Sequence, residues 1–188
     1  SGATCFGYKG CFGVCLPLIW YIYGLDAFYL CGVSLIMGQL VACIIKITCQ
    51  RPRPPSPKGI TRTIPVKKAV VGNNPDSPSF PSGDTMCGSA VGASLYFVTG
   101  QPAWLLVGVW AAFGRVHWWC HWVFDVIGGF IIGTVSVYVT DFILPKEKRE
   151  AETVVTIILG YLCFMHMMGE YQTKMHRINS EKGEIKVE

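Results

Sequence analysis

The chain has 188 residues, a length that fits one domain, and carries a formal net charge of +4. Hydrophobic residues make up 51% of it and charged residues only 15%, whereas a soluble domain usually has about 25% charged residues. This composition disfavours an ordinary soluble domain, although a soluble helical protein with a large apolar core is the alternative. We expect an all-α fold, a polytopic transmembrane helical bundle whose outer surface faces lipid.

Six helices are expected, because uncharged apolar runs follow one another with short polar linkers. A bilayer core is spanned by about 20 apolar residues, and the run 27–45 has nineteen residues without a charge. Further uncharged runs cover 85–113, 126–140 and 153–169. The expected helices are 11–25, 27–47, 84–99, 102–119, 122–143 and 152–170. The first is the weakest of the six, since Pro17 lies inside it.

Residues 1–170 are expected to form one transmembrane domain, followed by a polar tail at 171–188. Nine cysteines are present, an odd number without any CxxC pair, and most lie inside apolar runs. We interpret them as small apolar side chains that stay reduced, and not as a disulfide framework or a zinc site.

The longest polar stretch, 50–83, is rich in proline and basic residues and has no acid before Asp76. A loop of this length inside a compact domain is often functional. Six crossings would place both termini and this loop on one side, which then carries thirteen of the 16 basic residues. The positive-inside rule would put that side in the cytosol. Several of these charges belong to a candidate binding site, however, so the orientation stays open.

We therefore expect an integral, multi-pass membrane protein. The identity of the membrane is left open by the sequence, and endomembranes and the mitochondrial inner membrane are both compatible with it. Membrane lipids are the expected surroundings, and no nucleic-acid partner is expected.

Three polar clusters fall at the ends of expected helices on that one side, and the first two of them lie within the expected active-site loop, about 46–84. The first has a lysine, six intervening residues and then Arg-Pro. The second is a Pro-Ser-Gly-Asp sequence that opens an expected helix. In the third, an arginine is followed after five residues by a histidine, and after three more by an aspartate. Their residues are Lys46, Arg53 and Pro54; Pro81, Ser82, Gly83 and Asp84; and Arg115, His121 and Asp125.

These residue types suit phosphoryl transfer, in which catalysis is mostly positioning and electrostatic stabilisation. Fixed positive charge around the phosphate oxygens could come from Lys46, Arg53 and Arg115, and the planar guanidinium of arginine matches phosphate geometry. Backbone N–H groups at a helix start add donors and a favourable dipole. Ser82 and Gly83 stand at such a start.

A nucleophile is also available. The neutral imidazole of His121 could attack phosphorus and form a phosphohistidine. Asp125 follows four residues later and would lie on the same face if this stretch is helical. Its carboxylate would then orient the ring and stabilise its charged form, as the acid of a catalytic triad does.

The spacings K-x6-RP, PSG-x and R-x5-H-x3-D resemble the three signature motifs of the PAP2 superfamily. That group includes lipid phosphate phosphatases, polyprenyl diphosphate phosphatases and vanadium haloperoxidases. The resemblance runs from Lys46 to about Gly133, nearly half of the chain, and implies a PAP2-like helical core. It implies His121 as nucleophile with Asp125 as its partner. It also implies catalysis without a metal or other cofactor, and phosphate ligands at Lys46, Arg53, Ser82, Gly83 and Arg115.

Two positions depart from the family pattern. Gly114 stands where the third motif commonly has serine, a change that we expect to be minor. Asp84 occupies the place of the histidine of the usual PSGH, which protonates the leaving oxygen as general acid. Asp84 could do so only if its carboxyl stayed protonated, and nearby Lys and Arg oppose that. A phosphate leaving group needs little protonation, so Asp84 fits a diphosphate substrate better than a monoester.

Other interpretations exist for the individual residues. Lys46 could extend to the membrane interface, and residues 81–84 could be an ordinary helix N-terminus. His117 lies four residues before His121, but no further metal ligands are apparent. An interfacial aromatic belt is the interpretation for the tryptophans around it, Trp118, Trp119 and Trp122.

The leading hypothesis is a membrane phosphatase for a lipid phosphate or polyprenyl diphosphate, acting through a phosphohistidine at His121, with a phosphorylated lipid as its substrate. The alternative is a PAP2-like pseudoenzyme that serves as a structural or lipid-binding subunit of a membrane complex. Asp84, which removes the usual acid, favours this alternative.

Overall fold

The computed structural model describes residues 10–49, 51–55 and 78–145, together with the single residues 155, 159, 160, 162 and 166. Two compact units divide the chain: Ser1–Ile64 with Pro75–Glu150, and Pro65–Asn74 with Ala151–Glu188. Every element named below belongs to the first unit. The helix expected at 152–170 falls in the second, where the five single residues are helical and the others lie outside the described part. The tail at 171–188 also lies outside it, and the domain limit at 170 stays a prediction.

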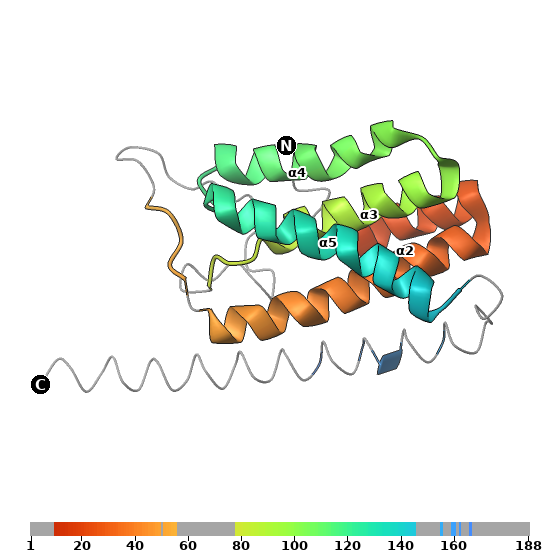
Figure 1. The fold of residues 1–188 in the computed structure, drawn as a ribbon, viewed down its shortest axis with the longest axis horizontal. Coiled ribbons are helices and arrows are strands. Elements are labelled where there is room, and N and C mark those ends of the chain that lie inside the picture. The colour runs from red at the N-terminus through yellow and green to blue at the C-terminus, as the bar shows by residue number, and fades with distance from the viewer. Residues whose placement is uncertain are drawn as a thin grey trace, which may run out of the picture. The chain divides into compact units, whose positions relative to one another are not determined.

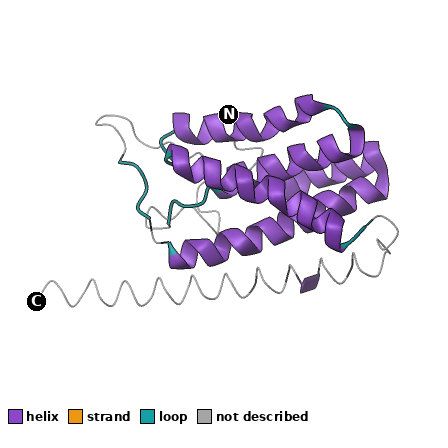
Figure 2. Cartoon of the chain, viewed as in Figure 1, coloured by secondary structure: helices purple, strands orange, loops and turns teal. Residues whose placement is uncertain are grey.

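The described residues are helical without any strand, which confirms the all-α class (Figures 1 and 2). Four α-helices are present among them, so the arrangement of six is not confirmed. A short π-helix precedes the first, and a 3-10 turn precedes the third. In chain order the elements are η2 (Cys11–Cys15), α2 (Leu16–Thr48), α3 (Gly83–Thr99), η3 (Pro102–Leu105), α4 (Leu106–His117) and α5 (Val123–Ile143).

Helix α2 is broken at Gly24, whose φ of 83° and ψ of −174° are not helical. Only glycine adopts this conformation readily. A Cβ atom placed on Gly32 would lie 3.8 Å from the side chain of Leu16, although an unbroken helix would separate these residues by about 24 Å. The chain therefore turns back on itself at Gly24. The predicted pair 11–25 and 27–47 thus corresponds to the two limbs of α2, with the break at Gly24 and not at Asp26.

Helix α3 is the centre of the bundle, and α2, α4 and α5 all pack against it. Its residues from Thr85 to Leu95 are all buried. Small residues on α5 make a close approach feasible, because a methyl group on Gly129 would overlap the carbonyl oxygen of Ser82. One on Gly133 would overlap the carbonyl oxygen of Met86. The spacing of these two glycines is the small-xxx-small pattern that lets helix backbones meet in membranes.

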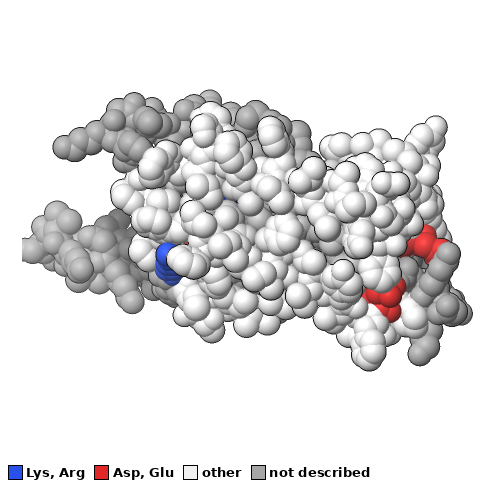
Figure 3. All heavy atoms as spheres, turned by 45° about the horizontal axis from the view of Figure 1, so that its top comes forward, with Lys and Arg blue, Asp and Glu red and all other residues white. Residues whose placement is uncertain are grey.

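The outer faces of the helices are strongly apolar. Side chains more than half exposed include Tyr21, Ile22, Trp110, Phe113, Ile131 and Phe142. On the face shown in Figure 3, the described charged side chains lie only near the two ends of the bundle. Extended apolar surface of this kind marks contact with lipid or another protein.

Two of the described helical segments, Cys11–Thr48 and Val123–Ile143, are long and apolar enough to cross a membrane. Because the first turns back at Gly24, the relevant length is that of its second limb, residues 25–48. At 1.5 Å per residue this limb is about 36 Å long, enough for a hydrocarbon core of about 30 Å. The structure is thus consistent with membrane association, and the multi-pass arrangement stays a prediction.

The contact between α3 and α5 gives a first prediction. Replacing Gly133 with alanine places a methyl group against the Met86 carbonyl and the Ser89 hydroxyl. Overpacking of this kind typically costs about 1–3 kcal/mol, so Gly133→Ala should lower the melting temperature in detergent. Gly13→Ala is the matched control, because no atom lies within 4 Å of its added methyl group. A Gly133→Ala protein as stable as the control would contradict the close approach.

Candidate active site

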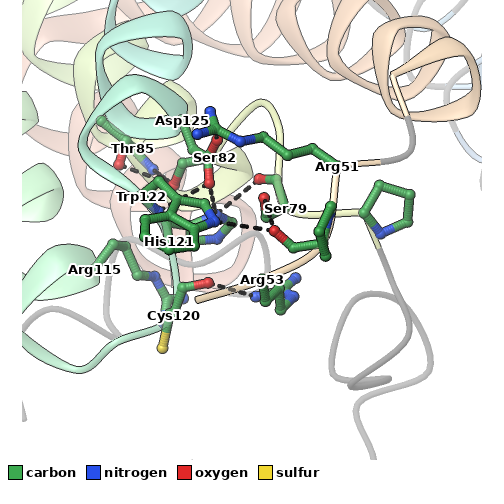
Figure 4. Close-up of polar contacts among 12 residues, drawn as sticks. Arg51, Arg53, Ser79, Ser82, Thr85, Arg115, Cys120, His121, Trp122 and Asp125 are labelled. Carbon is green, nitrogen blue, oxygen red and sulfur yellow. Dashed lines mark hydrogen bonds and ion pairs between the residues drawn. The ribbon is translucent and has the colours of Figure 1, made fainter. Parts of the chain in front are cut away.

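The polar clusters meet at one end of the bundle because of the order of its helices. Helices α2 and α4 end there, and α3 and α5 begin there (Figures 1 and 4). Lys46 lies in the last turn of α2 and Arg115 in the last turn of α4. Asp84 and Asp125 lie in the first turns of α3 and α5. Residues up to 79 positions apart in the sequence are thereby brought together.

Ser82 fixes the start of α3. It has an extended conformation, and its hydroxyl accepts a hydrogen bond from the backbone N–H of Thr85 at 3.4 Å, as an N-cap residue does. Its own N–H donates to the carbonyl oxygen of Asp125 at 2.9 Å. Gly83 is the first residue of the helix. The second motif is thus tied directly to the third.

His121 lies in the turn between α4 and α5, and its position depends on an unusual residue. Trp119 adopts a positive φ of 54°, a conformation uncommon for a bulky side chain. This turn lets the N–H groups of Cys120 and His121 both donate to the carbonyl oxygen of Arg115, at 3.1 and 3.3 Å. The His121 ring is consequently directed into the protein, where the residue is only 7% exposed.

The tautomer of His121 follows from its neighbour. Its Nδ1 lies 2.8 Å from the carbonyl oxygen of Ser79, and a carbonyl oxygen can only accept. Nδ1 therefore carries the proton, and in the neutral ring Nε2 holds the free lone pair. A nucleophilic histidine needs this arrangement, with one nitrogen held and the other available.

Asp125 is fully buried, and its carboxylate is surrounded by polar groups, among them the side chain of Ser79. Oδ2 accepts from the N–H of Trp122 at 2.9 Å and lies 3.7 Å from Nδ1 of His121. Oδ1 accepts from the guanidinium of Arg51 at 3.0 Å. His121 and Asp125 thus face each other as predicted, although His121 precedes α5, which begins at Val123.

The three predicted phosphate-binding cations surround this pair. Lys46 donates to the carbonyl oxygen of Pro78 at 3.0 Å, and Arg53 donates to the carbonyl oxygen of Cys120 at 3.1 Å. Arg115 lies 3.9 Å from the sulfur of Cys120. The positive charges of all three act on His121.

Burial is the largest cause that lowers the pKa of His121, to about 4. The three cations lower this pKa further, while the nearby Asp125 carboxylate opposes them. The imidazole is therefore neutral at physiological pH, with its Nε2 lone pair available.

Asp84 forms an ion pair with Arg115, and both side chains are largely buried. An arginine beside a carboxylate favours its ionised form. The residue in the general-acid position is therefore paired with one of the predicted phosphate ligands, and the role of each stays a prediction.

Four further residues contribute to the site without having been assigned to it from sequence: Arg51, Ser79, Cys120 and Trp122. Arg51 stood in the basic loop, but its spacing matched no motif position. The contributions of Ser79 and Cys120 to His121 and Arg53 are made by backbone carbonyls, which side-chain patterns do not reveal. Trp122 contributes its backbone N–H to Asp125, and its indole N–H donates to the carbonyl oxygen of Pro52 at 3.0 Å.

His117 belongs to an aromatic cluster. Its ring stacks on Phe113 at 5.7 Å between centroids and meets Trp118 edge-on at 5.5 Å. Within the described part of the chain, no group of three or more His, Cys, Asp or Glu side chains is arranged to hold a metal ion.

The described residues together form an all-helical bundle with an apolar exterior and a cluster of basic side chains around a buried histidine at one end. The family model of the PAP2 superfamily matches residues 27–149, a range that contains every site residue named above, and the chain belongs to this phosphatase-type superfamily. No curated protein and no solved structure matches the chain.

The environment of His121 gives a second prediction. Because burial and three cations disfavour the imidazolium, His121 should titrate near pH 4, below the ordinary value of 6.5. NMR titration of histidine-labelled protein in detergent measures this, with the resonance assigned by its loss in His121→Asn. A pKa at or above 6.5 in the folded protein would contradict the described environment.

Proposed function

We propose that this protein is a membrane phosphatase that hydrolyses a phosphorylated lipid through a phosphohistidine at His121. The tautomer of His121 carries this proposal. Nδ1 is engaged by the Ser79 carbonyl, 3.7 Å from the Asp125 carboxylate, while Nε2 is left as a nucleophile. Membership of the PAP2 superfamily supports phosphatase chemistry.

In the first step, the lone pair of Nε2 attacks phosphorus, and the bond from phosphorus to the leaving oxygen breaks with its electron pair on that oxygen. The imidazole becomes positively charged, and Asp125 stabilises it. Lys46, Arg53 and Arg115 bind the phosphoryl oxygens, together with the backbone N–H of Gly83 at the start of α3; the N–H of Ser82 is already engaged by the Asp125 carbonyl. In the second step water attacks phosphorus, the N–P bond breaks, and phosphate is released with neutral His121 restored.

The leaving group distinguishes the candidate substrates. An alkoxide, the leaving group of a phosphate monoester such as phosphatidate, needs a proton from a general acid. Asp84 is paired with Arg115, and because an arginine beside a carboxylate favours its ionised form, this carboxyl is expected to be a poor donor. A diphosphate instead releases a phosphate monoester, which is stable as an anion. We propose a polyprenyl diphosphate as the preferred substrate class.

A second candidate function is that of a PAP2-like subunit that binds phosphorylated lipid without hydrolysing it. The Asp84–Arg115 ion pair favours it, because it removes a proton donor and engages a phosphate ligand at once. The two candidates differ in turnover and agree on binding.

The third prediction tests the nucleophile. Phosphate release should be measured for a prenyl diphosphate, phosphatidate and lysophosphatidate, with wild type and with His121→Ala. The substitution should abolish hydrolysis, because it removes Nε2, while bound lipid is retained. His117→Ala is the matched control, since this ring packs outside the site, and it should keep most of the activity. Hydrolysis that survives His121→Ala would rule out this nucleophile, and binding without turnover by wild type would support the subunit.

The fourth prediction concerns Asp84. Asp84→His restores a group that can donate a proton at neutral pH. It should raise phosphatidate hydrolysis by about a hundredfold, the lower range for a general acid. The ratio of phosphatidate to prenyl diphosphate turnover is the measurement.

Asp84→Asn is the control for this change, because it removes the carboxylate from Arg115 without supplying an acid. If Asp84→Asn raises phosphatidate hydrolysis as much as Asp84→His, the gain comes from the released Arg115 and not from proton donation. Wild-type protein that cleaves phosphatidate at least as well as a prenyl diphosphate would overturn the proposed substrate preference.

A further inference from the structure

Arg51 lies in the site but matches none of the three motif positions, so the motifs assign it no role. Its guanidinium donates to Oδ1 of Asp125 at 3.0 Å and lies over the ring of Trp122, 5.7 Å from its centroid. The side chain is 37% exposed, whereas the carboxylate that it contacts is fully buried. The Arg51 side chain thus reaches from the loop to the buried Asp125 carboxylate (Figure 4).

The backbone beside Arg51 is held from two directions. The carbonyl oxygen of Arg51 accepts from the N–H of Ser79 at 2.8 Å. That of the next residue, Pro52, accepts from the indole N–H of Trp122 at 3.0 Å and from the Ser79 hydroxyl at 3.1 Å. Arg51 is therefore attached both to the segment whose carbonyl orients His121 and to the start of α5.

The two oxygens of the Asp125 carboxylate have separate partners. Oδ1 is bound by Arg51, whereas Oδ2 accepts from the Trp122 N–H and faces Nδ1 of His121. With one oxygen fixed by a guanidinium and the other by a backbone N–H, the carboxylate has little freedom to rotate. Its orientation toward the imidazole is thereby determined.

We propose that Arg51 is a positioning residue, which holds the Asp125 carboxylate so that Oδ2 stabilises the His121 imidazolium formed in the reaction. The effect of Arg51 on catalysis rests on the proposed function. The coupling between Arg51, Asp125 and His121 can be measured without turnover. The competing role is that of a fourth basic side chain that binds the phosphate, beside Lys46, Arg53 and Arg115.

Loss of Arg51 should affect turnover more than binding. Misplacement of a catalytic group by about 1 Å can cost a hundredfold in rate. Arg51→Gln should therefore lower kcat by about ten- to a hundredfold, with KM changed less than about threefold. Arg51→Lys, which keeps the charge but not the planar fork, should fall between Arg51→Gln and wild type. A phosphate ligand would instead show a raised KM and weaker inhibition by inorganic phosphate.

A double-mutant cycle separates the two roles. If Arg51 acts through Asp125, then Arg51→Gln should change kcat little in the Asp125→Asn background, because the group that it positions is gone. Additive losses in the double variant would overturn the inference. Asp141→Asn is the control for loss of a charge on α5, since it lies in the last turn, about 24 Å along the helix from Asp125.

His121 provides a readout that does not depend on activity. Charged groups face it from each element around it: Asp125 from α5, Lys46 from α2, Arg53 from the segment 51–55, and Arg115 from α4, itself paired with Asp84 of α3. Arg51→Gln frees the Asp125 carboxylate to turn away from the imidazolium, so it should lower the NMR-measured pKa of His121 by about one unit, whereas simple loss of a positive charge would raise that pKa. The fall should vanish when the two Asp125→Asn proteins, with and without Arg51, are compared.

These outcomes distinguish the inference from the proposed function. If no variant hydrolyses any lipid phosphate while the pKa shift appears and depends on Asp125, the phosphatase proposal fails and the positioning role stands. If Arg51→Gln leaves the pKa of His121 unchanged or raises it, the positioning role is wrong whatever the activity. Arg51→Lys takes the place of Arg51→Gln in each comparison if the glutamine variant does not fold.

Discussion

The arrangement of the site depends on a buried carboxylate, that of Asp125. An ionised carboxylate is costly to remove from water unless charges and hydrogen bonds replace its hydration. Asp125 is fully buried, and its replacement partners come from separate parts of the chain: Arg51 from the loop after α2, the Trp122 N–H at the start of α5, and His121 from the turn before it. Its backbone carbonyl also accepts from Ser82, which begins α3. One residue therefore connects three of the helix ends that form the site.

The close packing of α3 and α5 makes this connection feasible. Gly129 faces the carbonyl oxygen of Ser82, so the two helix starts can approach within hydrogen-bonding range only because no Cβ lies between them. The same contact brings the start of α3 next to Asp125, whose carbonyl accepts from the N–H of Ser82. Helix packing and the assembly of the site thus depend on the same small residues.

The helical class and the charged residues of the first and third motifs could be predicted from the sequence, because both leave local signals. Apolar runs reveal helices, and the fixed spacings K-x6-RP and R-x5-H-x3-D identify cations, His121 and Asp125. Helix ends that depend on the backbone conformation of one turn were harder to predict from the sequence. The expected helix 102–119 begins as a 3-10 turn at Pro102 and ends at His117, because Trp119 adopts a positive φ. Contacts between distant segments, such as Arg51 with Asp125 over 74 positions, have no local pattern at all.

The proposed reaction needs a nucleophile and a proton donor for the leaving group. The described residues supply the first more completely than the second. On the nucleophile side, His121 has a fixed tautomer, a lowered pKa and a held carboxylate partner, all of which favour attack on phosphorus. The leaving-group side has Asp84, whose charge is engaged by Arg115. If a phosphorylated lipid binds as proposed, its phosphate oxygens and the Asp84 carboxylate compete for the same guanidinium, and like charges repel. A diphosphate has more negative charge to interact with Lys46 and Arg53, and its leaving group departs without a proton. In the proposed reaction Asp84 therefore disfavours monoesters twice, in binding and in bond cleavage.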